Sequence, residues 1–130
     1  MEKQTTLSNS EWIIMEQLWM KSHTLMELVA ILNQRVGWSK STVATMVRRM
    51  EEKGVIIHTE QGRTKLFSPA VSRVEVTTRE TKNLLKRAYH GSLGLLVNTM
   101  VQSKDLTKED IEELYEILRK AEDAAQDKTS

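Results

Sequence analysis

Apolar side chains recur with the spacing of an amphipathic helix in three consecutive segments, which predicts helices over about 8–21, 24–35 and 39–53. The first two begin with Ser or Thr followed three residues later by Glu, the signature of a capping box. Gly54 follows the third, where a helix C-terminus favours a residue with positive φ. The stripes expected to face a shared core are Trp12, Met15, Leu18 and Trp19; Leu25, Leu28, Val29, Leu32 and Val36; and Val43, Met46, Val47 and Met50.

Two short β-prone runs, VIIHT and TKLFS, follow Gly54 and flank a loop that contains Gly62. This pattern predicts a β-hairpin. Three helices followed by a hairpin is the order of a winged helix-turn-helix, and the three helical stripes can share one small core. We therefore predict a mainly α protein whose residues 1–70 form a winged-helix domain with the hairpin as its wing.

The single proline, Pro69, separates this block from a C-terminal half that is helical almost to its end. About 50 residues bury too little surface for a self-sufficient core. We therefore predict a helical dimerisation region over 71–124, followed by a frayed tail over 125–130; the alternative is that these helices fold back on their own winged domain. The periodic stretches are 72–89, 93–101 and 107–123. The side chains expected in the dimer interface are Leu84, Leu85, Tyr89, Leu96, Ile111, Leu114, Tyr115 and Leu118.

The face of segment 39–53 opposite its apolar stripe is polar and carries no carboxylate before the last turn. Short hydroxyls near the start of a helix can approach phosphates and base edges closely, and arginines one turn later reach phosphate or guanine. Together with a basic hairpin loop, this pattern favours DNA reading over an ordinary solvated face. The candidate DNA contacts are Lys40, Ser41, Thr42, Ala44, Thr45, Arg48, Arg49, Arg63 and Lys65.

The distribution of charge suits a protein that touches an anion with one part only. The net charge of the 130 residues is +1. Residues 38–65 nevertheless carry six basic and three acidic side chains, whereas residues 105–127 carry nine acidic and three basic ones. We interpret the acidic side chains near the end of the chain as a solvated outer face.

Composition narrows the class of protein further. The chain has no cysteine, which excludes disulfides and thiolate metal sites, and it shows neither a signal peptide nor a membrane-spanning run. We therefore expect a cytoplasmic protein that does not contact a membrane. The histidines lack metal-ligand spacing, and there is no glycine-rich phosphate loop or G-x-S-x-G motif. We predict no enzymatic activity, no cofactor and no metal; His58, in the predicted hairpin, could instead meet a phosphate.

Four segments together resemble the penicillinase repressor family, which includes the β-lactamase and methicillin-resistance repressors. They are LSNSEWIIMEQLW, GWSKSTVATMVRRMEEKGVI, GRTKLFSPAVS, and GSLGLLV followed by DLTKEDIEEL. The resemblance covers nearly the whole chain. It implies a homodimer that binds a pseudo-palindromic operator in double-stranded DNA and represses transcription.

The resemblance also implies which residues read DNA. It places four residues at the family's reading positions: Ser41, Thr42, Ala44 and Thr45. Arg49 falls on a position that is commonly basic in the family. This sequence departs from the family at Lys40, where proline is frequent, and at Ser41 and Ala44, where basic residues are frequent. We expect the operator sequence to differ accordingly.

Two regulatory devices of the family can be compared with this sequence. Copper-responsive members use a cysteine cluster near the C-terminus, which this chain lacks. Antibiotic-responsive members are inactivated by proteolysis in their C-terminal region, downstream of a membrane sensor. The matching stretch here is LVNTMV, so we hypothesise cleavage between Thr99 and Met100 by a membrane-sensor-linked protease.

Two other functions stay open at this point. Some winged helices bind partner proteins and not DNA, and some repressors are released by a small ligand. Salt distinguishes the first alternative, because a repressor with several phosphate contacts binds duplexes at low salt and loses affinity steeply as salt rises.

Overall fold

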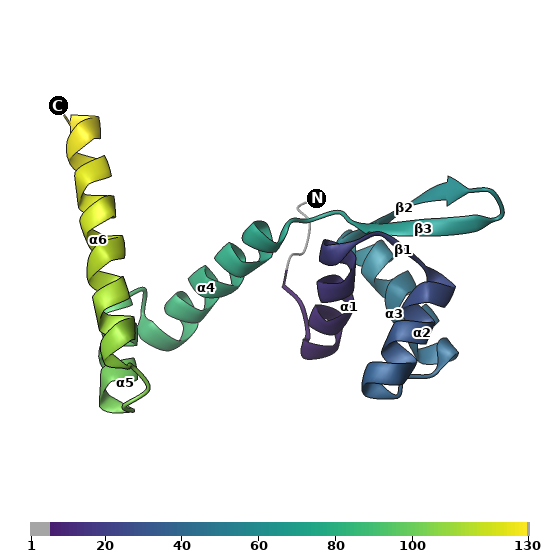
Figure 1. The fold of residues 1–130 in the computed structure, drawn as a ribbon, viewed down its shortest axis with the longest axis horizontal. Helices are drawn as coiled ribbons and strands as arrows, with labels where there is room; N and C mark the ends of the chain where they lie inside the picture. Colours follow the sequence, from purple (N-terminus) through teal and green to yellow (C-terminus); the bar gives the residue numbers. More distant parts are fainter. Residues whose placement is uncertain (1–5, 130) are drawn as a thin grey trace. The chain divides into compact units, whose positions relative to one another are not determined.

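The N-terminal half folds into three helices and a β-hairpin, as the apolar pattern predicts. The computed structural model describes residues 6–129 (Figure 1). Ser8 and Thr24 close capping boxes, because each side chain accepts a bond from the backbone N–H of a Glu that bonds back to the cap N–H. Ser39 caps the third helix by accepting from the Thr42 N–H at 3.3 Å. The helices are α1 (Asn9–Met20), α2 (Leu25–Val36) and α3 (Lys40–Lys53).

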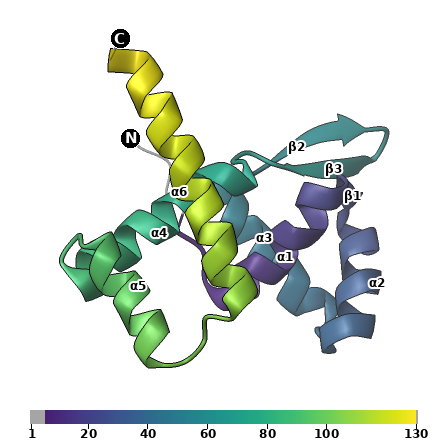
Figure 2. The ribbon, with the colours of Figure 1, turned by 60° about the vertical axis from the view of Figure 1, so that its left-hand side comes forward.

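The predicted hairpin is present, and it pairs with a short strand that the sequence did not reveal. The strands are β1 (His23–Thr24), β2 (Ile56–Gln61) and β3 (Thr64–Pro69). They form one antiparallel sheet in the order β1-β3-β2, in which Phe67 stands opposite both His23 and His58. The hairpin of β2 and β3, here called the wing, extends away from the three helices in both views (Figures 1 and 2).

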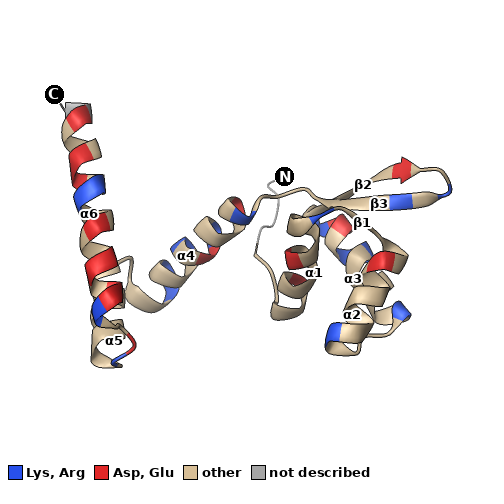
Figure 3. Cartoon of the chain, in the orientation of Figure 1, with Lys and Arg blue, Asp and Glu red and all other residues tan. Residues whose placement is uncertain are grey.

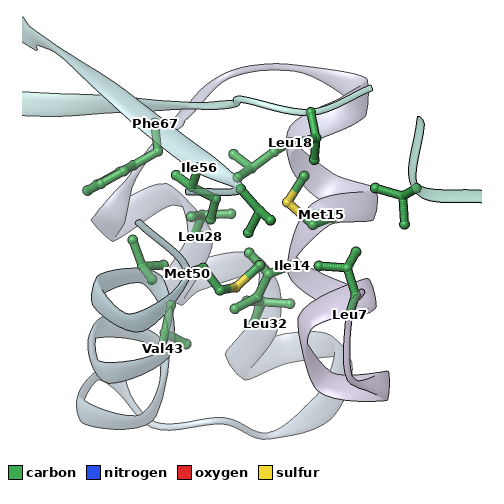
Figure 4. Close-up of a cluster of buried hydrophobic side chains, with 14 residues drawn as sticks. Leu7, Ile14, Met15, Leu18, Leu28, Leu32, Val43, Met50, Ile56 and Phe67 are labelled. Carbon is green, nitrogen blue, oxygen red and sulfur yellow. The ribbon is translucent and has the colours of Figure 1, made fainter. Parts of the chain in front are cut away.

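One hydrophobic core holds these elements together (Figure 4). Most positions of the three predicted stripes are buried or pack against the core, with Trp12 and Trp19 partly exposed. Val36, at the end of the second stripe, is instead 41% exposed. Ile14, which lies outside the predicted stripe, is also fully buried, so α1 buries a wider face than its spacing indicates. The buried apolar side chains are Leu7, Ile14, Met15, Leu18, Leu28, Leu32, Val43, Val47, Met50, Val55, Ile56, Phe67, Val71 and Val76.

The start of α4 (Arg73–Tyr89) belongs to the winged unit. The chain divides into two compact units between Asn83 and Leu84, whereas the sequence pattern placed the division after residue 70. The difference arises because Val76 of α4 is fully buried in the core built by α1, α2, α3 and the wing. The winged unit therefore includes about the first two thirds of α4.

The second unit contains the end of α4 and two further helices. Thr107 and Asp110 exchange two bonds of 3.0 Å between backbone N–H and side-chain oxygen, which starts the last helix as predicted. That helix continues past Asp123, so the expected frayed tail is helical through Thr129. The segment after Asp123 holds neither glycine nor proline, and alanine and glutamine extend a helix readily. The helices are α5 (Leu93–Gln102) and α6 (Lys108–Thr129).

The second unit has no buried interior of its own. None of the side chains of residues 84–127 is buried, although many are large and apolar. No helix within residues 6–129 is both long and apolar enough to cross a bilayer.

Candidate nucleic-acid interface

α3 presents its polar face to solvent, as the sequence predicts. The core-facing side chains Val43, Val47 and Met50 are buried, which fixes the rotation of the helix about its axis. Ala44 and Thr45 are half-buried at the edge of the polar face. The exposed candidates on this helix are Lys40, Ser41, Thr42, Arg48 and Arg49.

Three hydroxyls gather at the start of α3, and we call them the hydroxyl cluster: Ser39, Ser41 and Thr42. The Ser39 Oγ lies 3.1 Å from both the Ser41 Oγ and the Thr42 Oγ1. These bonds restrict the rotamers of the three exposed side chains. The cluster also lies beside the free N–H groups of the first helical turn, where anions are favoured.

The turn between α2 and α3 is fixed by local bonds. Gly37 ends α2 with φ 72°, a left-handed conformation that glycine adopts without steric cost. The Asn33 side chain donates to the Trp38 carbonyl at 3.1 Å. The backbone that delivers the hydroxyl cluster is therefore held on both sides of the turn.

The two arginines of α3 remain available to a ligand. Arg48 Nη1 lies 3.7 Å from Glu52 Oε1, and both side chains are 66% exposed. Such an exposed pair contributes about 0–1 kcal/mol and is screened by salt, so it competes weakly with a phosphate. Arg49 has no ion-pair partner among residues 6–129.

The C-terminal end of α3 is anchored to α1. Lys53 Nζ donates to Glu11 Oε1 at 2.9 Å, and both side chains are mostly buried. Burial raises the pKa of Glu11, but the bonds from the Ser8 N–H and from Lys53 outweigh it and hold the pKa below its ordinary value. Glu11 thus closes the capping box of α1 and also positions α3.

His58 ties the wing to α3. Its Nδ1 is hydrogen-bonded to Glu51 Oε2, its Nε2 lies 3.6 Å from Glu60 Oε1, and its ring packs edge-on to Phe67. Both ring nitrogens face carboxylates in this structure, and the phosphate contact considered from the sequence stays a prediction. Sequence reasoning missed the role of Glu51, because β2 reaches α3 only through the tertiary fold.

The wing carries its predicted cations at an exposed tip. Arg63 and Lys65 are exposed on either side of Thr64. Figure 3 shows basic residues on the wing. They also line a groove of about 400 Å³ between the wing and the start of α2, which Met26 and Phe67 help to line. The α2 side of this groove was not predicted; only the pairing of β1 with β3 brings the two elements together.

The predicted dimerisation residues lie on the surface of the second unit. Leu85, Tyr89, Leu96 and Leu114 are half-buried. The more exposed ones are Leu84 at 38%, Ile111 at 41%, Tyr115 at 67% and Leu118 at 57%. Further exposed apolar side chains that the prediction omitted are Leu93, Leu95, Val101 and Ile117.

The candidate cleavage site lies within a helix. Thr99 and Met100 are part of α5, and the Thr99 hydroxyl donates to the Leu95 carbonyl at 2.9 Å.

Across the part of the chain that the structure describes, no group of His, Asp and Glu side chains is arranged to hold a metal ion.

A comparison with protein families identifies the chain. The sequence model of the penicillinase repressor family matches residues 7–120. The chain belongs to the penicillinase repressor family. Members of this family are DNA-binding transcriptional repressors and not enzymes, which agrees with the sequence-based prediction.

Individual family members cover almost the same length. The penicillinase repressor of Bacillus licheniformis is 29% identical over 119 residues, which span 91% of this chain and 93% of that protein. The methicillin resistance regulatory protein MecI of Staphylococcus aureus is 28% identical over 115 residues, 88% of this chain and 94% of MecI.

Solved structures match the winged unit. The DNA-binding domain of the repressor BlaI has a TM-score of 0.52 and 28% identity, covering 56% of this chain and 90% of that domain. Monomeric Bacillus licheniformis BlaI in complex with the blaP half-operator has a TM-score of 0.51 and 25% identity, over 57% of this chain and 90% of that chain. These likenesses confirm the winged-helix prediction for the N-terminal half.

The lowered pKa of Glu11 predicts a pH-dependent free energy of unfolding. Because the folded pKa lies below the unfolded value of about 4.3, the stabilisation is present above that value and is lost as the pH falls through the folded pKa. Glu11→Gln can still complete the capping box but lacks the charge that faces Lys53. We expect it to lower the free energy of unfolding by about 1–3 kcal/mol at neutral pH.

Urea denaturation at several pH values measures this effect. The difference between Glu11→Gln and the unmodified protein should shrink as the pH falls from about 5 to about 3. Glu52→Gln, a change at a mostly exposed carboxylate, is the control and should have little effect at any pH. A Glu11→Gln difference that is constant across this range would contradict the role of the charge.

Proposed function

We propose that the protein is a homodimeric repressor that binds a pseudo-palindromic DNA operator through α3 and the wing of each copy. The hydroxyl cluster, Ala44 and Thr45 would meet base edges in the major groove, and Lys40, Arg48 and Arg49 the adjacent phosphates or guanines. Arg63 and Lys65 of the wing would contact the flanking backbone. Family membership supports the DNA-binding part of this proposal.

One observation carries the proposal most directly. Burial of the apolar stripe of α3 leaves a convex rod whose outer side holds hydroxyls and guanidinium groups and no acidic residue before Glu51. A rod of this chemistry fits a major groove, which admits one α-helix and offers hydrogen-bond partners on every base pair.

The exposed apolar side chains of the second unit support the proposal of a dimer. Its exposed apolar side chains need a partner surface, because a single copy buries none of the side chains of residues 84–127. A second copy related by a two-fold axis would cover them and would present two α3 helices to half-sites about 10 base pairs, or a multiple of that, apart.

We further propose that cleavage between Thr99 and Met100 relieves repression, by a protease linked to a membrane sensor. A cut there would separate α6 from the rest of the chain and remove half of the predicted dimer surface. Because the bond lies inside α5, the protease must act on a locally unwound helix.

Substitution of two threonines of α3 tests base reading. Thr42→Ala and Thr45→Ala should each lower affinity for the duplex that the protein selects from a random library by about 1–3 kcal/mol, with a smaller loss on unselected duplexes. Alanine favours a helix, so the fold should persist. Thr78→Ala on α4 is the matched control. Equal losses on both duplexes, measured by fluorescence anisotropy, would make these threonines phosphate contacts.

An arginine of the wing tests phosphate contact. Arg63→Ala should weaken binding to every duplex alike and reduce the slope of log affinity against log salt by about one unit. Arg119→Ala, which removes a cation from α6, should leave the slope unchanged. If the unmodified protein bound no duplex at low salt, the alternative of a protein-interaction module would replace the repressor.

Substitution of an exposed leucine of α6 tests self-association. Leu118 is 57% exposed in one copy, so Leu118→Asp should shift the protein to monomer while the winged unit stays folded. Lys120→Ala, on the opposite side of α6, should leave the dimer intact. Analytical ultracentrifugation at micromolar concentration reads both outcomes, and a monomeric unmodified protein would refute the dimer.

A further inference from the structure

The start of α4 is fastened to α1 by one arginine. Arg73 places its guanidinium against the carboxylate of Glu16 as a fork, with Nη1 donating to Oε1 at 2.9 Å and Nη2 donating to Oε2. The guanidinium carbon also lies 4.7 Å from the centre of the Trp19 ring. Because Glu16 and Trp19 are one turn apart on α1, Arg73 is held from two sides by the same helix.

The indole that receives Arg73 is itself fixed. Trp19 Nε1 donates to the Val71 carbonyl at 3.0 Å, in the short segment between β3 and α4. Its ring packs edge-on to Trp12, with 5.5 Å between centroids. The connection into α4 is therefore bound to α1 through its backbone as well as through Arg73.

Two further contacts continue along the same side of α4. Val76 is fully buried in the core, and Glu80 Oε1 accepts from the Leu7 N–H at 3.3 Å. Together with Arg73 these residues occupy positions i, i+3 and i+7, one face of a helix. The first two turns of α4 thus have a defined direction relative to α1.

The Arg73–Glu16 pair is partly exposed, so solvent screens part of its electrostatic attraction. The Arg73 and Glu16 side chains are 50% and 42% exposed, and pairs this exposed have small net free energies. Bidentate bonds and ring stacking instead impose a fixed geometry. The bonds from Arg73 lower the pKa of Glu16, so the pair is charged at neutral pH.

The direction of the first turns of α4 matters because α4 is a long helix. Its 17 residues make it about 25 Å long, and it runs without interruption from the winged unit into the second unit. A change of about 10° at its start would displace its far end by about 4 Å. That displacement exceeds the rise of about 3.4 Å for one base pair.

We propose that the contact of Arg73 with Glu16 and Trp19 sets the half-site spacing that the dimer accepts, by fixing the angle at which α4 leaves the DNA-reading unit. The inference rests on the proposed function, since it requires a dimer with one α3 in each half-site. Arg73 is a positioning residue: it touches no DNA, and it acts on the distance between the two α3 helices.

The test measures affinity against spacing. The probes are duplexes with two inverted copies of the half-site that the protein selects from a random library, at the selected spacing and with one or two base pairs added or removed. A duplex with one half-site is included. The variants are Arg73→Ala and Arg73→Lys, where lysine keeps the charge and loses the fork. Arg79→Ala, an exposed cation on the same helix, is the matched control.

Both Arg73 variants should bind the single half-site like the unmodified protein. Their affinity for the selected spacing should fall about tenfold, or about 1.4 kcal/mol, with smaller losses at the altered spacings, so that the spacing profile broadens. Arg79→Ala should keep the narrow profile. A narrow profile in both Arg73 variants, or an equal loss on the single half-site, would overturn the positioning role. Failure of the unmodified protein to dimerise or to bind any duplex would instead refute the proposed function.

Discussion

Burial of one side of α3 is the constraint on which the rest of the structure depends. Val43, Val47 and Met50 enter a core that also receives side chains from α1, α2, the wing and the start of α4. Once these three are inside, helical geometry sends the hydroxyl cluster and the arginines outward. The exposure of this polar face is therefore a consequence of packing, and Gly37, Asn33 and the Lys53–Glu11 pair then fix where the two ends of the helix lie.

The two units of the chain solve different physical problems. The winged unit builds a buried core from its own apolar side chains, although some, such as Met20 and Val74, stay exposed. The second unit leaves large apolar side chains exposed. Its acidic residues are concentrated on α6 (Figure 3), so the part of the sequence that would repel a nucleic acid is distant in sequence from α3. α4 belongs to both units, and its first turns are attached to α1 by Arg73 and to the core by Val76.

Local signals predicted much of the fold, and long-range contacts account for most of what was missed. The caps at Ser8, Thr24 and Ser39 involve residues three apart, so the sequence displays them directly. β1 has only two residues, too few for a periodic pattern, and exists because β3 pairs with it. The partnership of Glu16 with Arg73 spans 57 residues and leaves no mark in either segment. Among the candidate site residues, exposure on α3 followed from helical spacing, whereas the groove beside Met26 required the tertiary fold.

The hydroxyl cluster has a consequence for how a base sequence would be read. In each of its two side-chain bonds either oxygen can be the donor, so each hydroxyl can offer a proton or a lone pair without moving the backbone. A guanidinium, which can only donate, would impose one polarity on the base it meets. At contacts proposed for these hydroxyls, reversal of a base pair would be tolerated, and strict discrimination would rest on methyl packing and on the shape of the duplex.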